Sequence, residues 1–216
     1  WIVEPVVDTE KYKLSSFFVQ NSLGIKTLFK SNYMKKISLY LVATGSLSIV
    51  VYNLLDDLLA VEYGFSPFGI SILFSVACLV AGFASMYVPR LKIKFDERMM
   101  LIVSMVVMAF VLILSPLIGM VLSGVLLMVR VILEVLYDNA SSTIINRNTD
   151  SSVSATTLSS LSLLRSLPYA IGGSFIGGAV QFVGGAKNFS MWFGLALMII
   201  TVVLGARIER DKKIPS

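Results

Sequence analysis

The stretch GMVLSGVLLMVRVILEVLYDNASSTIIN (residues 119–146), followed by SVSATTLSSLSLLRSLPYAIGGSFIGG (residues 152–178), predicts a long helical hairpin. Both limbs are long and apolar enough to cross a hydrocarbon core of ~30 Å. The first limb nevertheless contains Arg130 and Glu134, and the second contains Arg165. A charge at bilayer depth costs ~2.5–3.5 kcal/mol on insertion scales, so such residues usually face a bundle interior or a wet cavity. We therefore expect the rest of the chain to form a scaffold that gives this hairpin a cavity.

The composition is that of a polytopic helical membrane protein. Of the 216 residues, 56% are hydrophobic and 14% are charged, and the mean hydropathy is +0.83; soluble domains have about 25% charged residues. Apolar runs between short charged segments predict an all-α transmembrane domain of six helices over residues 36–206, embedded in the lipid bilayer. Besides the two limbs of the hairpin, its spans are expected at 36–55, 67–88, 98–114 and 189–206.

The positive charges alternate between the two sides of this predicted domain. Six lysines precede residue 37, four basic residues lie in 90–98 and four lie in 207–216, whereas the connections on the other side contain only Lys187. This positive-inside pattern places both ends of the chain in the cytoplasm. The net charge of +5 is explained by topology, so we expect no nucleic acid among the partners.

The first 35 residues form a lead-in to the domain. Residues 1–5 are typical of the end of an apolar segment, so we expect further chain before Trp1. From Leu14 onward the apolar residues approximate a helical stripe, which indicates an amphipathic helix on the cytoplasmic membrane surface. An unstructured linker is the alternative. Residues 207–216 are expected to be a cytoplasmic tail.

The first span contains several polar residues. Tyr40 and Asn53 are candidate cavity residues within it. Asp56 and Asp57 follow at its outer end, where we expect them to face water or cap a broken helix, with a cation or proton role as the alternative.

Several residues mark the ends of the other spans. Ser66–Pro67 predicts an N-cap and first helical position, Pro89 predicts the end of the second span, and Ser115–Pro116 predicts a tight outer turn. The cytoplasmic loop PRLKIKFDER contains Asp96 and Glu97, which are expected to be solvated or to pair with a neighbouring helix.

Three charged residues of the first limb share one helical face. Arg130 and Glu134 are four residues apart, and Asp138 continues the row. Glu134 and Arg165 are equally far from the centre of the connection INRNTDSS, so antiparallel limbs would place them at similar depths. In a functional interpretation Glu134 accepts a proton or a cationic group, and the two arginines set its affinity. In a structural interpretation the charges neutralise one another and fix two helices. Tyr137 is a further candidate cavity residue.

The second limb ends in a run of small residues. Gly173 and Gly177 form a GxxxG pattern, and Gly172 and Gly178 extend it. Small residues allow helix backbones to approach closely in a membrane, so we predict a helix-packing seam here.

The sequence contains few residues of the types that an intramembrane enzyme would need. The sequence has no histidine, which disfavours metal-dependent and serine-type intramembrane proteases. Cys78 is the single cysteine, so a disulfide within the chain is impossible. We therefore expect neither an enzyme nor a bound cofactor or metal.

The pattern of spans resembles the C-terminal half of a major facilitator superfamily transporter. GFSPFGIS (residues 64–71) resembles the entry to the eighth helix of that family, and residues 137–173 resemble its tenth helix, the following loop and its eleventh helix. The resemblance implies twelve helices in two halves, with a central site alternately open to either side. Residues 1–5 would then end the sixth helix, and an N-terminal six-helix half would be the partner of this chain.

The resemblance leads us to expect a secondary transporter in a bacterial plasma membrane. No nucleotide-binding motif is present, which favours coupling to a proton or ion gradient or facilitated diffusion. By analogy with the family, we expect an antiporter for the proton-coupled efflux of small amphipathic compounds. The alternative is a non-transporting, half-size membrane protein with a docking or regulatory role.

Overall fold

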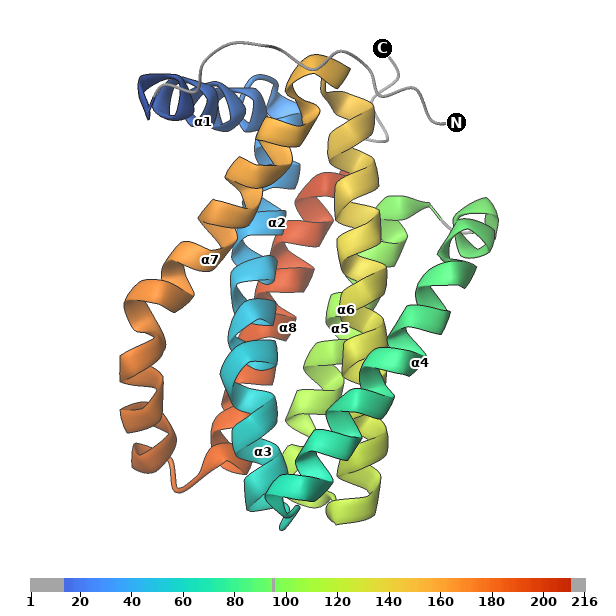
Figure 1. Ribbon diagram of the computed structural model, residues 1–216, viewed down its shortest axis with the longest axis vertical. Helices are drawn as coiled ribbons and strands as arrows, with labels where there is room; N and C mark the ends of the chain where they lie inside the picture. Colours follow the sequence, from blue (N-terminus) through green and yellow to red (C-terminus); the bar gives the residue numbers. More distant parts are fainter. Residues whose placement is uncertain (1–13, 95, 211–216) are drawn as a thin grey trace.

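The computed structural model is all-helical apart from short connections over the residues that it describes, which are 14–94 and 96–210 (Figure 1). Side chains are described from Asn21 to Tyr87 and from Asp96 to Ile208. The expected helix end at residues 1–5 and most of the predicted tail lie outside these ranges. The helices are α1 (Leu14–Leu28), α2 (Asn32–Val50), α3 (Asp56–Glu62), α4 (Pro67–Lys94), α5 (Glu97–Ile113), α6 (Met120–Asn148), α7 (Ser151–Phe182) and α8 (Ala186–Arg210).

A π-helical turn, Val51–Leu55, joins α2 to α3 and makes one continuous helix of Asn32–Glu62. The predicted break near residue 56 is therefore wrong, because the backbone N–H of Asp56 donates to the carbonyl of Val51 and the helix continues. Pro89 also lies inside α4, so it does not end that helix. A proline inside a helix lacks a backbone donor and crowds the carbonyl four residues before it, yet α4 continues from Pro89 to Lys94.

Four of the described helices are long and apolar enough to cross a membrane, namely Asn32–Glu62, Pro67–Tyr87, Met120–Asn148 and Ala186–Ile208. The protein is therefore an all-α chain with helices suited to a bilayer. The helices α5 and α7 occupy the places of the third and fifth predicted spans. A short 3-10 turn, Ser115–Leu117, separates α5 from α6 as the sequence predicts.

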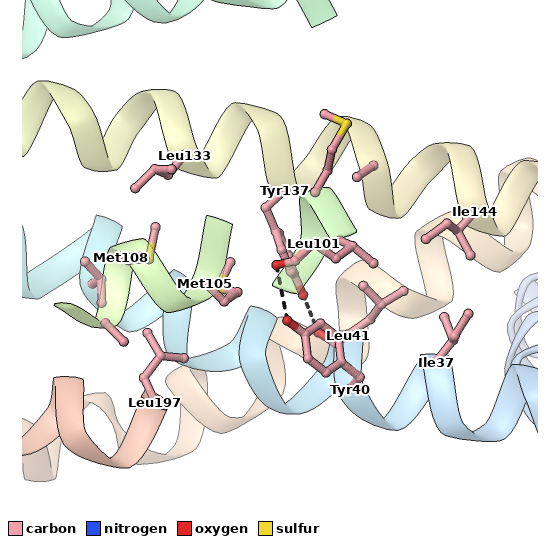
Figure 2. Packing of buried hydrophobic residues seen from close by; sticks show 14 of the residues in the cluster. Ile37, Tyr40, Leu41, Leu101, Met105, Met108, Leu133, Tyr137, Ile144 and Leu197 are labelled. Carbon is pink, nitrogen blue, oxygen red and sulfur yellow. Dashed lines mark hydrogen bonds between the residues drawn. The ribbon is translucent and has the colours of Figure 1, made fainter. Parts of the chain in front are cut away.

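The main core lies where α2, α5, α6 and α8 meet. Tyr40, Met105, Met108 and Tyr137 are almost completely buried there, together with Leu197 of α8 (Figure 2). The helix α8, which lies at the place of the sixth predicted span, packs along α5 and α2. One face of α8 carries Gly194, which has no side chain, so α8 can approach α5 closely there.

Two glycines allow close helix contacts that the sequence analysis did not single out. A Cβ at Gly194 of α8 would lie 2.8 Å from the carbonyl oxygen of Ala109 in α5. A Cβ at Gly24 of α1 would lie 2.7 Å from the carbonyl oxygen of Thr156 in α7. Both contacts are against backbone, which cannot move aside cheaply. The absence of a side chain therefore sets the distance between these helix pairs.

The predicted hairpin is formed by α6 and α7, which join at Thr149 and Asp150. Its limbs diverge away from this turn, and α7 packs mainly on α1 and α2 (Figure 1). The helix α1 lies across the end of the bundle beside the turn, where Ser160 of α7 donates a hydrogen bond to the carbonyl of Asn21 at 3.3 Å. The predicted helix from Leu14 is therefore present, whereas an unstructured linker is not.

The outer helix α4 packs on α6 through a second, smaller apolar cluster. It consists of Leu73, Ala77 and Ala81 from α4 with Leu127 and Val131 from α6. Much of the remaining surface of α4 is apolar and exposed, as the lipid-facing side of a membrane helix would be.

We predict that Gly194→Ala destabilises the protein, whereas Gly177→Ala does not. Both replacements give a helix a better helix former, but only the first inserts a methyl group against backbone. Overpacking of this kind costs about 1–3 kcal/mol. The free energy of unfolding of each variant in mixed micelles would measure the difference. Equal stabilities would contradict the assigned contact between α8 and α5.

Candidate functional site

Arg130 forms an ion pair with Asp56 through its Nη2 atom. Their side chains are only 3% and 2% exposed, so the pair is buried between α6 and the start of α3. The expectation that Asp56 faces water is therefore wrong, whereas Asp57 is exposed. The π-helical turn directly before Asp56 changes the helical phase of the residues that follow it, and such turns often occur at functional sites.

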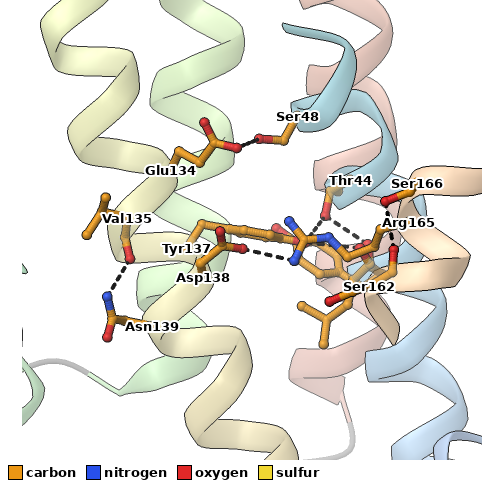
Figure 3. Close-up of polar contacts among 12 residues, drawn as sticks. Thr44, Ser48, Glu134, Val135, Tyr137, Asp138, Asn139, Ser162, Arg165 and Ser166 are labelled. Carbon is orange, nitrogen blue, oxygen red and sulfur yellow. Dashed lines mark hydrogen bonds and ion pairs between the residues drawn. The ribbon is translucent and has the colours of Figure 1, made fainter. Parts of the chain in front are cut away.

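Glu134 lies one turn along α6 from Arg130 and is half-buried. Its Oε1 atom accepts a hydrogen bond from the Ser48 hydroxyl of α2 at 3.3 Å (Figure 3). Within the described part of the chain, no cation forms an ion pair with this carboxylate. The nearest arginine along the helix, Arg130, is already paired with Asp56.

Arg165 of α7 pairs with Asp138 of α6, with 2.9 Å between Nη1 and Oδ1. Its guanidinium carbon lies 5.2 Å from the ring centre of Tyr137, within the range of a cation–π contact (Figure 3). The equal count from the hairpin turn predicted that Arg165 and Glu134 lie at similar depths. The arginine pairs with Asp138, one turn from Glu134 toward the α6–α7 connection, and α7 itself lies mainly against α1 and α2.

Gly45 of α2 provides the path for this arginine. A Cβ at that position would overlap the Arg165 Nε atom and would lie 2.8 Å from its Cδ atom. The side chain of Arg165 therefore passes directly over a bare section of α2 on its way to α6. The sequence alone did not indicate a role for Gly45, because a single glycine in an apolar helix does not reveal which distant side chain packs over it.

The other candidate cavity residues of the sequence analysis lie elsewhere. Tyr40 and Tyr137 are completely buried; their hydroxyls donate to the carbonyls of Leu101 at 3.2 Å and Leu41 at 3.1 Å, respectively. Tyr137 also shares a 2.9 Å hydrogen bond with Thr44. These tyrosines are core residues. Asn53 is exposed, and its amide donates to the carbonyl of Ile49 one turn back.

A cavity of about 510 Å³ opens between α4 and α6 beside the π-helical turn. Its size is within the range of about 300–1,000 Å³ found for small-molecule sites. Glu134 and Asp138 are the charged residues of its wall. The full lining is Tyr52, Cys78, Ala81, Gly82, Ser85, Val131, Glu134, Val135, Asp138 and Asn139. The sequence analysis identified the two carboxylates but not Tyr52, which the π-helical turn carries.

The four glycines at the end of α7 do not form a packing seam within the described chain. A Cβ at Gly172, Gly177 or Gly178 would meet no atom within 4 Å, and one at Gly173 would meet only Tyr169 of the same helix. The physical reason is the divergence of α7, which carries this section away from the other helices (Figure 1).

Other acidic residues close the two ends of the bundle. Glu97, the first residue of α5, pairs with Arg147 of α6 at 2.6 Å, which is the contact with a neighbouring helix that the sequence analysis gave as one of two alternatives. At the opposite end, Glu62 accepts hydrogen bonds from the backbone N–H groups of Ala186 and Lys187 at the start of α8. Among the described residues, no group of three or more acidic or cysteine side chains comes together as a metal site would require.

Comparisons of the chain with family models, with curated proteins and with solved structures find no match.

We predict that loss of either partner of the buried ion pair strongly destabilises the fold. Asp56→Asn or Arg130→Met leaves one buried charge or polar group without its partner, which typically costs about 3–5 kcal/mol. The double variant Asp56→Leu with Arg130→Met should recover most of this loss. Reversible unfolding in mixed micelles measures these free energies, with exposed Asp57→Asn as the control. Single variants as stable as that control would disprove the pair.

We further predict that Gly45→Ala disturbs the protein only while Arg165 is present. The new methyl group would displace the arginine from Asp138 and Tyr137, whereas in an Arg165→Ala background it would meet no such obstacle. A double-mutant cycle of unfolding free energies should therefore show a coupling of about 0.5–3 kcal/mol. Additive effects would show that the arginine does not lie over Gly45.

Proposed function

We propose that the chain is the C-terminal half of a secondary transporter, which moves a small solute by alternating access and couples this movement to protons through Glu134. The observation that carries the proposal is a half-buried carboxylate without an ion-pair partner among the described residues, on the wall of a cavity in a bundle suited to a membrane. Intramembrane ionisable residues of this kind are functional-site candidates by default.

The distribution of charges favours Glu134 over its neighbours as the coupling residue. Arg130 is paired with Asp56, and Arg165 is paired with Asp138. Proton exchange at Asp56 or Asp138 would break an ion pair, whereas exchange at Glu134 replaces only a hydrogen bond from Ser48. Glu134 also borders the cavity, so a proton could reach it through water there.

The Arg165–Asp138 pair would connect proton binding to helix movement. It joins α7 to α6 one turn along α6 from Glu134. A change in charge on Glu134 alters the electrostatic balance at this pair, because two carboxylates and one guanidinium share the region. Binding or release of a proton would thus shift the position of α7. This shift would close the site to one side of the membrane and open it to the other.

The proposed direction is efflux in exchange for protons at the plasma membrane. It follows the resemblance to major facilitator transporters, in which a second six-helix half supplies the opposite wall of the central site. In this arrangement the open side of the α4–α6 cavity would face that second half.

A docking or regulatory protein without transport is the second candidate. The observation that favours it is the uncovered small-residue section of α7, which could receive another membrane helix. This candidate needs no exchange of protons at Glu134, so the transport measurement below separates the two.

We predict that Glu134→Gln abolishes solute accumulation driven by a pH gradient while membrane insertion is unchanged. The amide keeps the size of the side chain and can still contact Ser48, but it cannot bind and release a proton. Uptake of amphipathic solutes by membrane vesicles under an imposed pH gradient measures the effect, with Asp57→Asn as the carboxylate control. Unchanged accumulation in the Glu134→Gln variant at a saturating gradient would overturn the coupling role.

A further inference from the structure

The charged groups around the α4–α6 cavity leave one uncompensated negative charge. Among the residues whose side chains the structure describes, its wall contains two carboxylates, Glu134 and Asp138, and no basic residue. The Asp138 charge is offset by Arg165, which approaches from α7. Arg130 is near Glu134 along the helix, but Asp56 already neutralises it. The net charge presented to an occupant is therefore that of Glu134 alone.

The rest of the wall suits an organic group better than a hydrated metal ion. Cys78, Ala81, Val131 and Val135 present apolar surface, and Tyr52 adds an aromatic ring that is 44% exposed. Hard metal cations require about six oxygen ligands, which this wall does not gather in one place. An ammonium group on an apolar body can instead pair with one carboxylate, contact an aromatic face and leave its body against the apolar wall.

We infer that the cavity between α4 and α6 binds an amphiphilic organic monocation, whose positive group pairs with Glu134 and whose apolar body contacts the wall around Cys78. This deepens the proposed transport function and rests on it for the movement of the cation, though not for its binding. The volume of about 510 Å³ accommodates a drug-sized body. Because one carboxylate neutralises one positive charge, a proton and the organic cation compete for Glu134. Such competition is what an exchange mechanism requires.

Cys78 offers a direct measurement of this cavity, because it is exposed on the wall and is the only cysteine of the chain. Methanethiosulfonate reagents attack the ionised thiol and therefore need water at the site. The cationic trimethylammonium-ethyl reagent and the anionic sulfonato-ethyl reagent are similar in size. Their rates at Cys78 in membrane vesicles, read from the mass of the peptide that contains it, are each divided by the rate with a free thiol in solution.

We predict that the corrected rate ratio favours the cationic reagent by about tenfold, which corresponds to about 1.4 kcal/mol of electrostatic preference. The preference should disappear in Glu134→Gln and persist in the exposed control Asp57→Asn. A ratio unchanged by Glu134→Gln would overturn the inference, because the charge of Glu134 would then not act on the cavity. Failure of both reagents to modify Cys78 would also overturn it, because the cavity would then lack water.

Protection of Cys78 tests binding itself. Tetraphenylphosphonium and tetraphenylborate have nearly the same size and shape but opposite charges. The cation should slow modification of Cys78 by neutral N-ethylmaleimide in the unaltered protein and not in Glu134→Gln, and the anion should not protect. Protection by both ions, or by neither, would overturn the inference.

The binding and transport proposals can fail separately. Charge-dependent protection without movement of tetraphenylphosphonium into vesicles would support the cation site and count against the transport function. Gradient-driven movement of other solutes without such protection would support transport and overturn the cation site.

Discussion

The buried ion pair between Arg130 and Asp56 is the constraint on which the rest of the site depends. Two charges so far from water are tolerable only when each finds the other, and removal of one leaves its partner without compensation. The pair joins α6 to α3, the end of the continuous helix Asn32–Glu62. It thereby fixes the rotation of α6 about its own axis, because Arg130, Glu134 and Asp138 lie at helical spacing on one face. Once Arg130 is held against α3, Glu134 must lie at the edge of the cavity.

The charged residues of the interior therefore divide into two kinds. Arg130, Asp56, Arg165 and Asp138 are engaged with one another across helices, and they define where α3, α6 and α7 stand. Within the described part of the chain, the partner of Glu134 is the neutral hydroxyl of Ser48, which leaves the charge of this carboxylate unpaired there. The sequence analysis considered a functional and a structural interpretation for the whole row. The structure supports a mixed arrangement, in which the paired residues hold the geometry that exposes the unpaired one.

Local patterns in the sequence predicted much of this fold. The apolar runs located the long helices, the polar connection located the turn at Thr149 and Asp150, and the spacing of four residues placed the charged row on one face of α6. What could not be predicted depends on distant parts of the chain. The π-helical turn that continues the first span into α3 has no clear local signal, so Asp56 was expected at the membrane edge.

The placement of α7 shows the same limit. A GxxxG pattern indicates that a close helix contact is possible, but it does not identify the partner helix. In this chain Gly24, Gly45 and Gly194 make the close contacts instead. Tyr40 and Tyr137 resembled cavity residues because they are polar in an apolar setting. Their hydroxyls donate hydrogen bonds to backbone carbonyls in the core, and these bonds can be seen only in the tertiary structure.

The passage of Arg165 over Gly45 has a consequence for how this protein can change over evolutionary time. The two positions are 120 residues apart in the chain, yet the space occupied by one is the space denied to the other. A side chain gained at position 45 therefore costs less stability after position 165 has lost its long side chain than before. Among descendants of this sequence, a change at position 45 should thus tend to follow the loss of Arg165, and Asp138 is freed to vary once the arginine is gone.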